Sequence, residues 1–136
     1  MRIAMLTILS TFACYTLSAN AGDSAELSES DICRAAISTI MGRPVHKILV
    51  ERVARDGVNF LFYIRPEDRT TWYFKCFTEK NVVTWGNASG RWRVDPDDSI
   101  VKFAVSNEVL TITDNYSDGS KKEKRFTKAD LEKPYR

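Results

Sequence analysis

The stretch from Thr71 to Phe77 is rich in aromatic residues, as β-strands are. Successive residues of a β-strand point to opposite faces, so the stretch predicts a strand with two distinct sides. One side would carry Trp72, Phe74 and Cys76, and the other Tyr73, Lys75 and Phe77. The cysteine therefore points to the same side as the tryptophan.

A helical period, with apolar residues three and four positions apart, occupies the segment from Ser30 to Met41. Ser28 stands in capping-box spacing before it, while Gly42 and then Pro44 end the pattern. The sequence predicts a helix over about residues 29–41. Its apolar face is made of two rows, Ile32/Ala36/Ile40 and Cys33/Ile37/Met41.

In the rest of the chain, apolar and polar residues alternate in short stretches. Turn residues separate these stretches about every eight to twelve positions, as in an antiparallel meander. Both faces of 58–65 are apolar, so this strand is expected inside the sheet, and Thr127 is expected to cap a helical turn over 127–131. The predicted fold is α+β: an N-terminal helix packed on a twisted antiparallel β-sheet of six or seven strands, open or curled toward a half-barrel. The predicted strands are 45–54, 58–65, 71–77, 82–85, 100–105, 108–113 and 121–126.

The first 21 residues have the pattern of a secretory signal peptide. Arg2 precedes a mostly apolar run over 3–17, and Ala19-Asn20-Ala21 is a small-x-small cleavage site. A single mature domain over 22–136, located in the periplasm or secreted, is therefore expected, with no stable membrane insertion after cleavage. A transmembrane anchor and a lipid on Cys14 are the alternatives. The short, interrupted apolar run disfavours the anchor, and Thr11-Phe12-Ala13 is a poor match to the small-residue context of a lipidation site.

Cleavage of the signal would leave two cysteines, Cys33 and Cys76. In an oxidising compartment they admit one intramolecular disulfide bond, and a helix packed on the sheet would bring them together. Two buried free thiols are the alternative. No metal site is expected, because two cysteines and one histidine without a close pair lack tetrahedral ligand spacing.

The net charge of the chain says little about a partner. It is +2, and it falls to +1 without Arg2, the one charged residue of the segment 1–21. Such a balance gives no general attraction to nucleic acid or anionic lipid, so a nucleic-acid partner is not expected. The basic cluster 121–125 fits the polar decoration of an edge strand.

No constellation of catalytic residues stands out, so no cofactor and no catalytic residues are predicted, and enzymatic activity is left as the less favoured interpretation. His46 is the one histidine, and the acidic residues of 67–68 and 95–98 fall in turns that contain proline. A small hydrolase that uses Asp97 or Asp98 is kept as an alternative.

The longest irregular stretch, 86–98, contains Arg91-Trp92-Arg93. Tryptophan and arginine are enriched at the energetic centres of protein interfaces, so this stretch is the predicted binding region. The alternative is that Trp92 folds back onto the sheet while the arginines pair with nearby aspartates. The candidate binding residues are Trp85, Ser89, Gly90, Arg91, Trp92 and Arg93.

Several segments together resemble a family of small exported bacterial proteins with no assigned activity: 32–37, 40–44, 72–76, 90–93 and 116–120. A weaker similarity is to periplasmic inhibitors of lysozyme, carried by the Tyr73–Cys76 strand and by Ser89-Gly90-Arg91-Trp92. The first resemblance implies no site residues. The second implies an inhibitory loop. Because no catalytic constellation stands out and the 86–98 stretch has the character of an exposed loop, the expected function is a non-catalytic binding domain for a secreted or periplasmic protein. An inhibitor or immunity protein against a wall-degrading enzyme such as lysozyme is the alternative.

Overall fold

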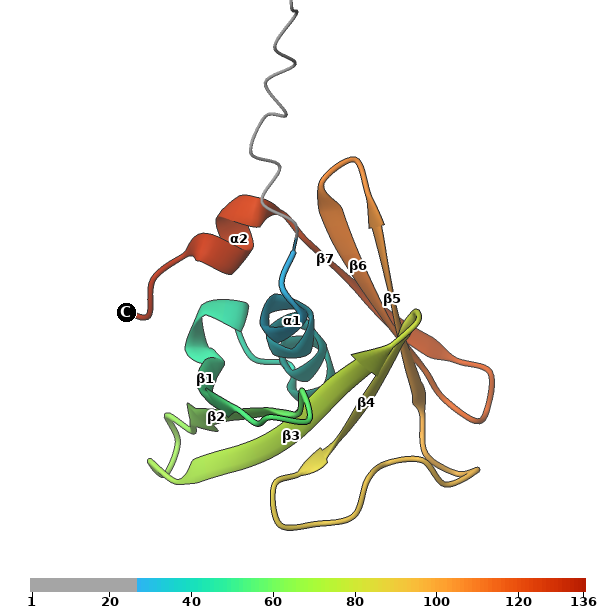
Figure 1. The fold of residues 1–136 in the computed structure, drawn as a ribbon, viewed down its shortest axis with the longest axis horizontal. Helices are drawn as coiled ribbons and strands as arrows, with labels where there is room; N and C mark the ends of the chain where they lie inside the picture. Colours follow the sequence, from blue (N-terminus) through green and yellow to red (C-terminus); the bar gives the residue numbers. More distant parts are fainter. Residues whose placement is uncertain (1–26) are drawn as a thin grey trace, which may run out of the picture.

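The computed structural model describes residues 27–136, so the predicted signal peptide lies outside the described residues. The elements follow the chain as a helix, a seven-strand meander and a short final helix (Figure 1). Their bounds are α1 Glu29–Met41, the 3₁₀ turn η1 Val45–Lys47, β1 Leu49–Val53, β2 Asn59–Ile64, β3 Thr71–Glu79, β4 Val82–Asn87, β5 Ile100–Ser106, β6 Val109–Asn115, β7 Lys121–Phe126 and α2 Lys128–Glu132.

Every strand pairs antiparallel with its neighbour in the chain, in the order β1-β2-β3-β4-β5-β6-β7. The pairing between β4 and β5 is short, with two residue pairs, Val82 with Lys102 and Val83 with Val101. At this narrow junction the sheet divides into two parts that enclose α1 (Figure 1). The sequence left a half-barrel open as an interpretation; the sheet is instead open, with β1 and β7 as its edges among the described residues.

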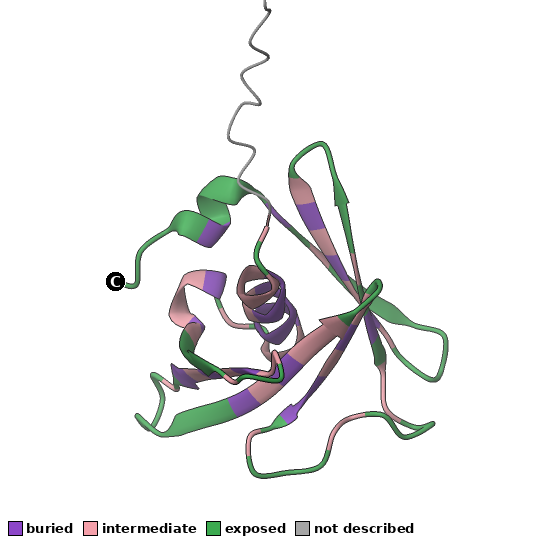
Figure 2. Ribbon diagram, viewed as in Figure 1, coloured by how far each residue is buried: buried purple, intermediate pink, exposed green. Residues whose placement is uncertain are grey.

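Helix α1 forms the centre of the core, as its apolar pattern predicts. It contacts β3 from one part of the sheet and β6 and β7 from the other, and Figure 2 shows the buried residues gathered along it. Ser28 caps its first turn by accepting a hydrogen bond from the backbone N–H of Asp31, and Gly42 ends it in the left-handed conformation. The buried residues of the helix are Ile32, Cys33, Ala35, Ala36, Ile37, Ser38 and Thr39.

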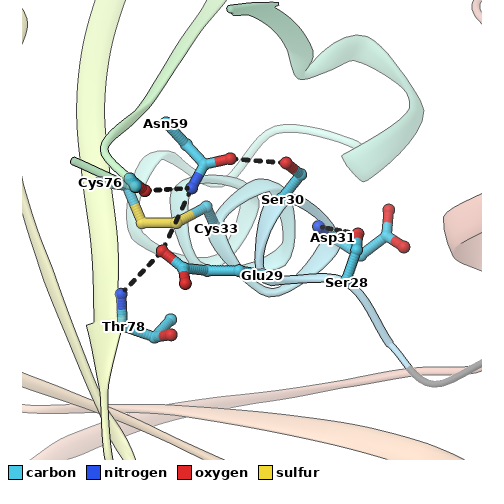
Figure 3. The surroundings of a disulfide bond; sticks show 9 residues. Ser28, Glu29, Ser30, Asp31, Cys33, Asn59, Cys76 and Thr78 are labelled. Carbon is cyan, nitrogen blue, oxygen red and sulfur yellow. Dashed lines mark hydrogen bonds between the residues drawn. A yellow bond between two sulfur atoms is a disulfide. The ribbon is translucent and has the colours of Figure 1, made fainter. Parts of the chain in front are cut away.

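The predicted disulfide bond between Cys33 and Cys76 is confirmed, and it joins α1 to β3 with a Cα–Cα distance of 5.9 Å (Figure 3). Beside it, the buried amide of Asn59 accepts a hydrogen bond from Ser30 at 2.5 Å and donates one to Glu29 at 3.3 Å. The Glu29 carboxylate also accepts from the backbone N–H of Thr78 at 3.3 Å. The first turn of α1 is therefore attached to β2 and β3 by polar contacts as well as by the bridge.

The guanidinium of Arg34 connects α1 with segments far away in the sequence. It donates to the carbonyl oxygens of Val45, Ile48 and Leu131 at 3.1, 2.9 and 3.0 Å. It also forms an ion pair with Asp31 at 3.1 Å. Since a guanidinium offers five N–H donors in a fixed plane, one side chain holds both η1 and the α2 segment against the helix.

The predicted strand 45–54 is wrong at its beginning, because Val45–Lys47 forms a 3₁₀ turn and β1 begins at Leu49. The turn is closed by the N–H of Lys47 donating to Pro44 O at 3.0 Å and that of Ile48 donating to Val45 O at 3.1 Å. Pro44 pre-sets the backbone for such a turn. The turn places Val45 and Ile48 in the core, which an alternating strand could not do because they lie an odd number of residues apart.

Candidate binding surface

The face of β2 and β3 that points away from α1 carries a group of aromatic side chains. Because Cys76 is bonded to the helix, Tyr73, Lys75 and Phe77 point to the opposite side of the sheet. Strand β2 adds Phe62, which pairs with Tyr73, and Phe60, which pairs with Lys75. We call the following residues the outer aromatic surface: Phe60, Phe62, Tyr73, Lys75, Phe77 and Trp92.

The rings of this surface pack against one another and against cations. The ring centroids of Phe62 and Tyr73 lie 5.9 Å apart, and Arg52 of β1 places its Cζ 3.9 Å from the ring centroid of Phe60. Cations over aromatic faces are attracted by the ring quadrupole. Tyr73 nevertheless remains 50% exposed, so the surface presents a large aromatic side chain to the solvent.

The segment after β4 folds back onto this surface. Trp92 forms an isolated antiparallel bridge with Gly86, and its ring lies edge-on to Phe77 at a centroid distance of 5.0 Å. Lys75 Nζ lies 4.4 Å from the Trp92 ring centroid and donates to the carbonyl oxygen of Gly90 at 2.7 Å. The predicted irregular stretch 86–98 therefore begins as an ordered return that holds Trp92 against β3.

Gly86 permits this return by the absence of a side chain. A Cβ atom at this position would lie 2.4 Å from the carbonyl oxygen of Arg91, far inside van der Waals contact. The obstacle is backbone, so it cannot swing aside as a flexible side chain can. Glycine at position 86 is thus required for the close approach of the two backbones.

The two arginines of the return share the carboxylate of Asp98, and Arg91 also contacts Asp95. Arg91 donates to both oxygens of Asp98, at 2.5 and 3.0 Å, and lies 3.1 Å from Asp95. Arg93 lies 3.7 Å from Asp98. The hydrogen bond from Arg91 is the main reason that the pKa of Asp98 falls from its ordinary 3.8 to about 2. A carboxylate held so acidic is a poor general base near neutral pH, which disfavours a hydrolase built on Asp98.

The predicted binding residues lie along the return and the strand with which it pairs. Ser89 and Gly90 are exposed at the tip of the return, followed by Arg91, the partly buried Trp92 and Arg93. Trp85 lies on the helix side of the sheet, where it is 8% exposed and packs against Phe74 with a centroid distance of 6.4 Å. Its carbonyl oxygen accepts a hydrogen bond from the N–H of Arg93 at 2.8 Å, and the Arg93 Cζ lies 5.5 Å from its ring centroid.

Sequence reasoning missed that β2 contributes to the surface. Phe60 and Phe62 were recognised only as one apolar face of a central strand. The signal that could have found them was the second apolar face of 58–65, together with the aromatic face of 71–77 that excludes the cysteine. Two strands with two apolar faces each leave one face without a helix when the fold contains a single long helix.

Other groups of possible chemical interest are accounted for by their surroundings. His46 lies in η1, where desolvation and the nearby cations, Lys133 foremost, lower its pKa. Within residues 27–136 no three His, Cys, Asp or Glu side chains are grouped closely enough to hold a metal ion. In the same range no helix has the length and apolar character needed to cross a bilayer.

No family model, curated protein or solved structure matches this chain.

Proposed function

We propose that the protein is an exported, non-catalytic binding domain that holds another periplasmic or secreted protein on the outer aromatic surface. The observation that carries this proposal is the aromatic face of β2 and β3, which no helix among the described residues covers and which retains a half-exposed tyrosine, Tyr73. Large exposed aromatic groups of this kind mark interaction sites on soluble domains.

The composition and rigidity of the surface support a protein partner. Tyrosine, tryptophan and arginine are the residues most enriched among those that dominate binding energy, and Tyr73, Trp92 and Arg52 all belong to this side of the sheet. Trp92 is fixed by Phe77, Lys75 and its backbone bridge before any partner arrives. A pre-ordered anchor loses less conformational entropy on association.

Two separate observations support an exported location. The Cys33–Cys76 bridge is of the kind that persists in oxidising compartments, and the first 21 residues carry the signal-peptide pattern. We therefore seek the partner among periplasmic or secreted proteins and not among nucleic acids.

The test compares two tyrosines of similar exposure. Tyr73 is 50% exposed on the outer aromatic surface, and Tyr116 is 42% exposed in the turn between β6 and β7. Proteins captured from periplasm or medium by the wild-type domain are identified and purified, and their dissociation constants are measured. Tyr73→Ala should weaken binding by about tenfold or more, and Tyr116→Ala by less than about twofold.

A partner that binds both variants as tightly as the wild type would remove the outer aromatic surface from the proposal. Reproducible turnover of a small substrate, abolished by replacing one polar residue, would refute the non-catalytic assignment altogether.

Inhibition of a wall-degrading enzyme such as lysozyme is a second candidate function. It is supported by the exposed tip Ser89-Gly90, which projects from a return held by Lys75 and by the arginine–Asp98 contacts, since a rigid loop is suited to enter an enzyme cleft. Lysozyme activity measured with and without the purified domain is the assay. An absence of inhibition across several lysozyme types would leave the general binding role as the better proposal.

A further inference from the structure

A cavity of 420 Å³ lies at the end of the sheet where the β2–β3 turn approaches η1 and the chain segment after α2. In Figure 1 the turn and this last segment lie on the same side of the molecule. Cavities of this volume are typical of small-molecule sites. It is formed by residues from 43 to 135 in the chain and does not include any member of the outer aromatic surface.

The cavity is lined by four cationic side chains and by no carboxylate. The nearest acid is Glu67, which lies 2.8 Å from Arg43 and 3.8 Å from Arg65. Within residues 27–136, Arg69 forms no ion pair, and Lys47 donates to the main-chain oxygen of Arg136. The cations of the lining are Arg43, Lys47, Arg65 and Arg69.

The second acid of the turn, Asp68, is occupied by the turn itself. Its carboxylate accepts from the backbone N–H of Thr70 at 3.1 Å and from the hydroxyl of Thr70 at 2.7 Å, and these bonds are the main reason that its pKa is lowered. It lies 3.8 Å from Arg65. Asp68 therefore shapes the loop and does not neutralise Arg69.

The backbone of the turn holds Arg69 in an unusual conformation. Its φ angle of 58° lies in the left-handed region, which is costly for a residue with a side chain. The loop is closed around it by the N–H of Arg69 donating to Arg65 O and that of Arg65 donating to Thr70 O, both at 2.8 Å. In addition, the buried Nε of Arg65 has no hydrogen-bond partner among the described residues.

The remaining lining is apolar or aromatic. Tyr63 is 4% exposed, with the Arg43 Cζ 5.5 Å from its ring centroid. Tyr135 stands beneath Lys47, whose Nζ is 4.3 Å from the ring centroid. Cationic and aromatic side chains thus line one cavity, together with Ile64 and two prolines.

We propose that this cavity binds a small organic anion: a phosphate or carboxylate group carried on an apolar or aromatic body. The unbalanced cations would receive the oxyanion, to which arginine and lysine donate charge-assisted hydrogen bonds. Tyr63, Ile64 and Tyr135 would contact the body of the ligand. This site is separate from the outer aromatic surface, so either proposal can fail alone.

The experiment titrates the whole domain with phenyl phosphate and follows binding by calorimetry and by the amide NMR signals of the β2–β3 turn. Phenol and inorganic phosphate test the two halves of the ligand, and benzoate separates carboxylate from phosphate recognition. We expect phenyl phosphate or benzoate to bind at least about tenfold more tightly than either phenol or inorganic phosphate. Vesicles of phosphatidylglycerol and of phosphatidylcholine test a lipid source of the anion.

Two variants remove a cation from the cavity, and a third removes one elsewhere. Lys47→Gln and Arg69→Gln should each weaken binding about tenfold. Arg55→Gln, in the exposed β1–β2 turn outside the cavity lining, lowers the net charge equally and should change binding less than about twofold. A natively dispersed amide NMR spectrum confirms that each variant is folded.

The proposal is overturned if neither aromatic anion gives saturable binding up to about 10 mM. It is equally overturned if inorganic phosphate binds as well as phenyl phosphate, or if Arg55→Gln weakens binding as much as the cavity variants do. Binding to anionic vesicles without binding to the soluble anions would assign the cations to a membrane surface and would also overturn it.

Discussion

Replacing Cys33 and Cys76 together by alanine should lower the free energy of unfolding by about 4 kcal/mol. The bridge closes a loop with a sequence separation of 43 residues. In the chain-entropy relation a loop of that size reduces the entropy of the unfolded chain by about 13 cal/mol/K, or about 4 kcal/mol at 25 °C. This is a large part of the roughly 5–15 kcal/mol that stabilises an ordinary domain.

The loss should appear as one cooperative transition, with helix and sheet unfolding together. From the sequence alone we expect the helix to loosen first and the sheet to persist. The structure argues otherwise, because β4 and β5 share two residue pairs and α1 packs against strands on both sides of that junction. A sheet divided in this way depends on the helix to keep its two parts in place.

The assay is urea denaturation at fixed pH, followed by tryptophan fluorescence for the sheet and by far-ultraviolet circular dichroism for the helix. The two probes should give coincident curves for both the wild type and the double variant. The reduced wild-type protein is the control, because it keeps both sulfur atoms in the core while losing the chain constraint. It should resemble the double variant to within about 1 kcal/mol.

A destabilisation below about 1 kcal/mol would refute the loop-closure reasoning. Helix loss well before the fluorescence change would instead restore the expectation drawn from the sequence. Two alkylatable thiols in protein taken from an oxidising compartment would contradict the bridge itself.

Three further predictions concern the loops. Gly86→Ala should lower the free energy of unfolding in urea by about 1–3 kcal/mol and shift the fluorescence of Trp92 to the red, because the new Cβ would lie 2.4 Å from a backbone oxygen. Gly90→Ala is the control: its Cβ would lie 3.4 Å from the nearest atom, so this variant should keep the wild-type emission. Stability should fall as the pH drops from about 4 to 2, since the pKa of Asp98 is about 2 in the folded protein against an ordinary 3.8, and Asp98→Asn should reduce this pH dependence in acid titrations. Arg69→Gly should be about 1 kcal/mol more stable to urea than Arg69→Ala, because glycine alone relieves the positive φ angle; equal stabilities would show that the turn is unstrained.

The sequence predicted the elements whose signals are local. The helix at 29–41 was predicted correctly because its apolar period, its Ser28 cap and its Gly42 terminus agree with one another. The capped helical turn after Thr127 is confirmed, with a full capping box to Asp130. The bridge was predicted by elimination, since the expected cleavage leaves two cysteines.

The failures have a common physical origin in contacts between distant segments. The strand predicted from residue 45 begins with a 3₁₀ turn, because Val45 and Ile48 both pack into the core. The local pattern of apolar and polar residues does not show that both side chains are buried. The surroundings of Trp85 also depend on such contacts: residue parity along β4 puts its ring on the helix side of the sheet, where it packs against Phe74 and lies 5.5 Å from the Arg93 Cζ.

The cavity could not be predicted from the sequence, because its lining comes from segments that are far apart in the chain. Its cations come from the end of α1, from η1 and from the β2–β3 turn, and one of its aromatic walls comes from Tyr135. No period or motif links these positions. Only the folded chain brings them around one space.

The hydrogen bonds by which Arg34 holds η1 and the α2 segment against α1 affect how the chain can fold during synthesis. A chain made from its N-terminus presents α1 long before residue 131 exists, yet the Arg34 guanidinium takes one of its acceptors from Leu131. That side chain is 14% exposed in the folded protein, so an incomplete chain would bury a charged donor without its last partner. Helix α1 therefore reaches its final environment only after α2 has been synthesised. A chain that ends before residue 131 should be degraded by proteases more readily than the full chain.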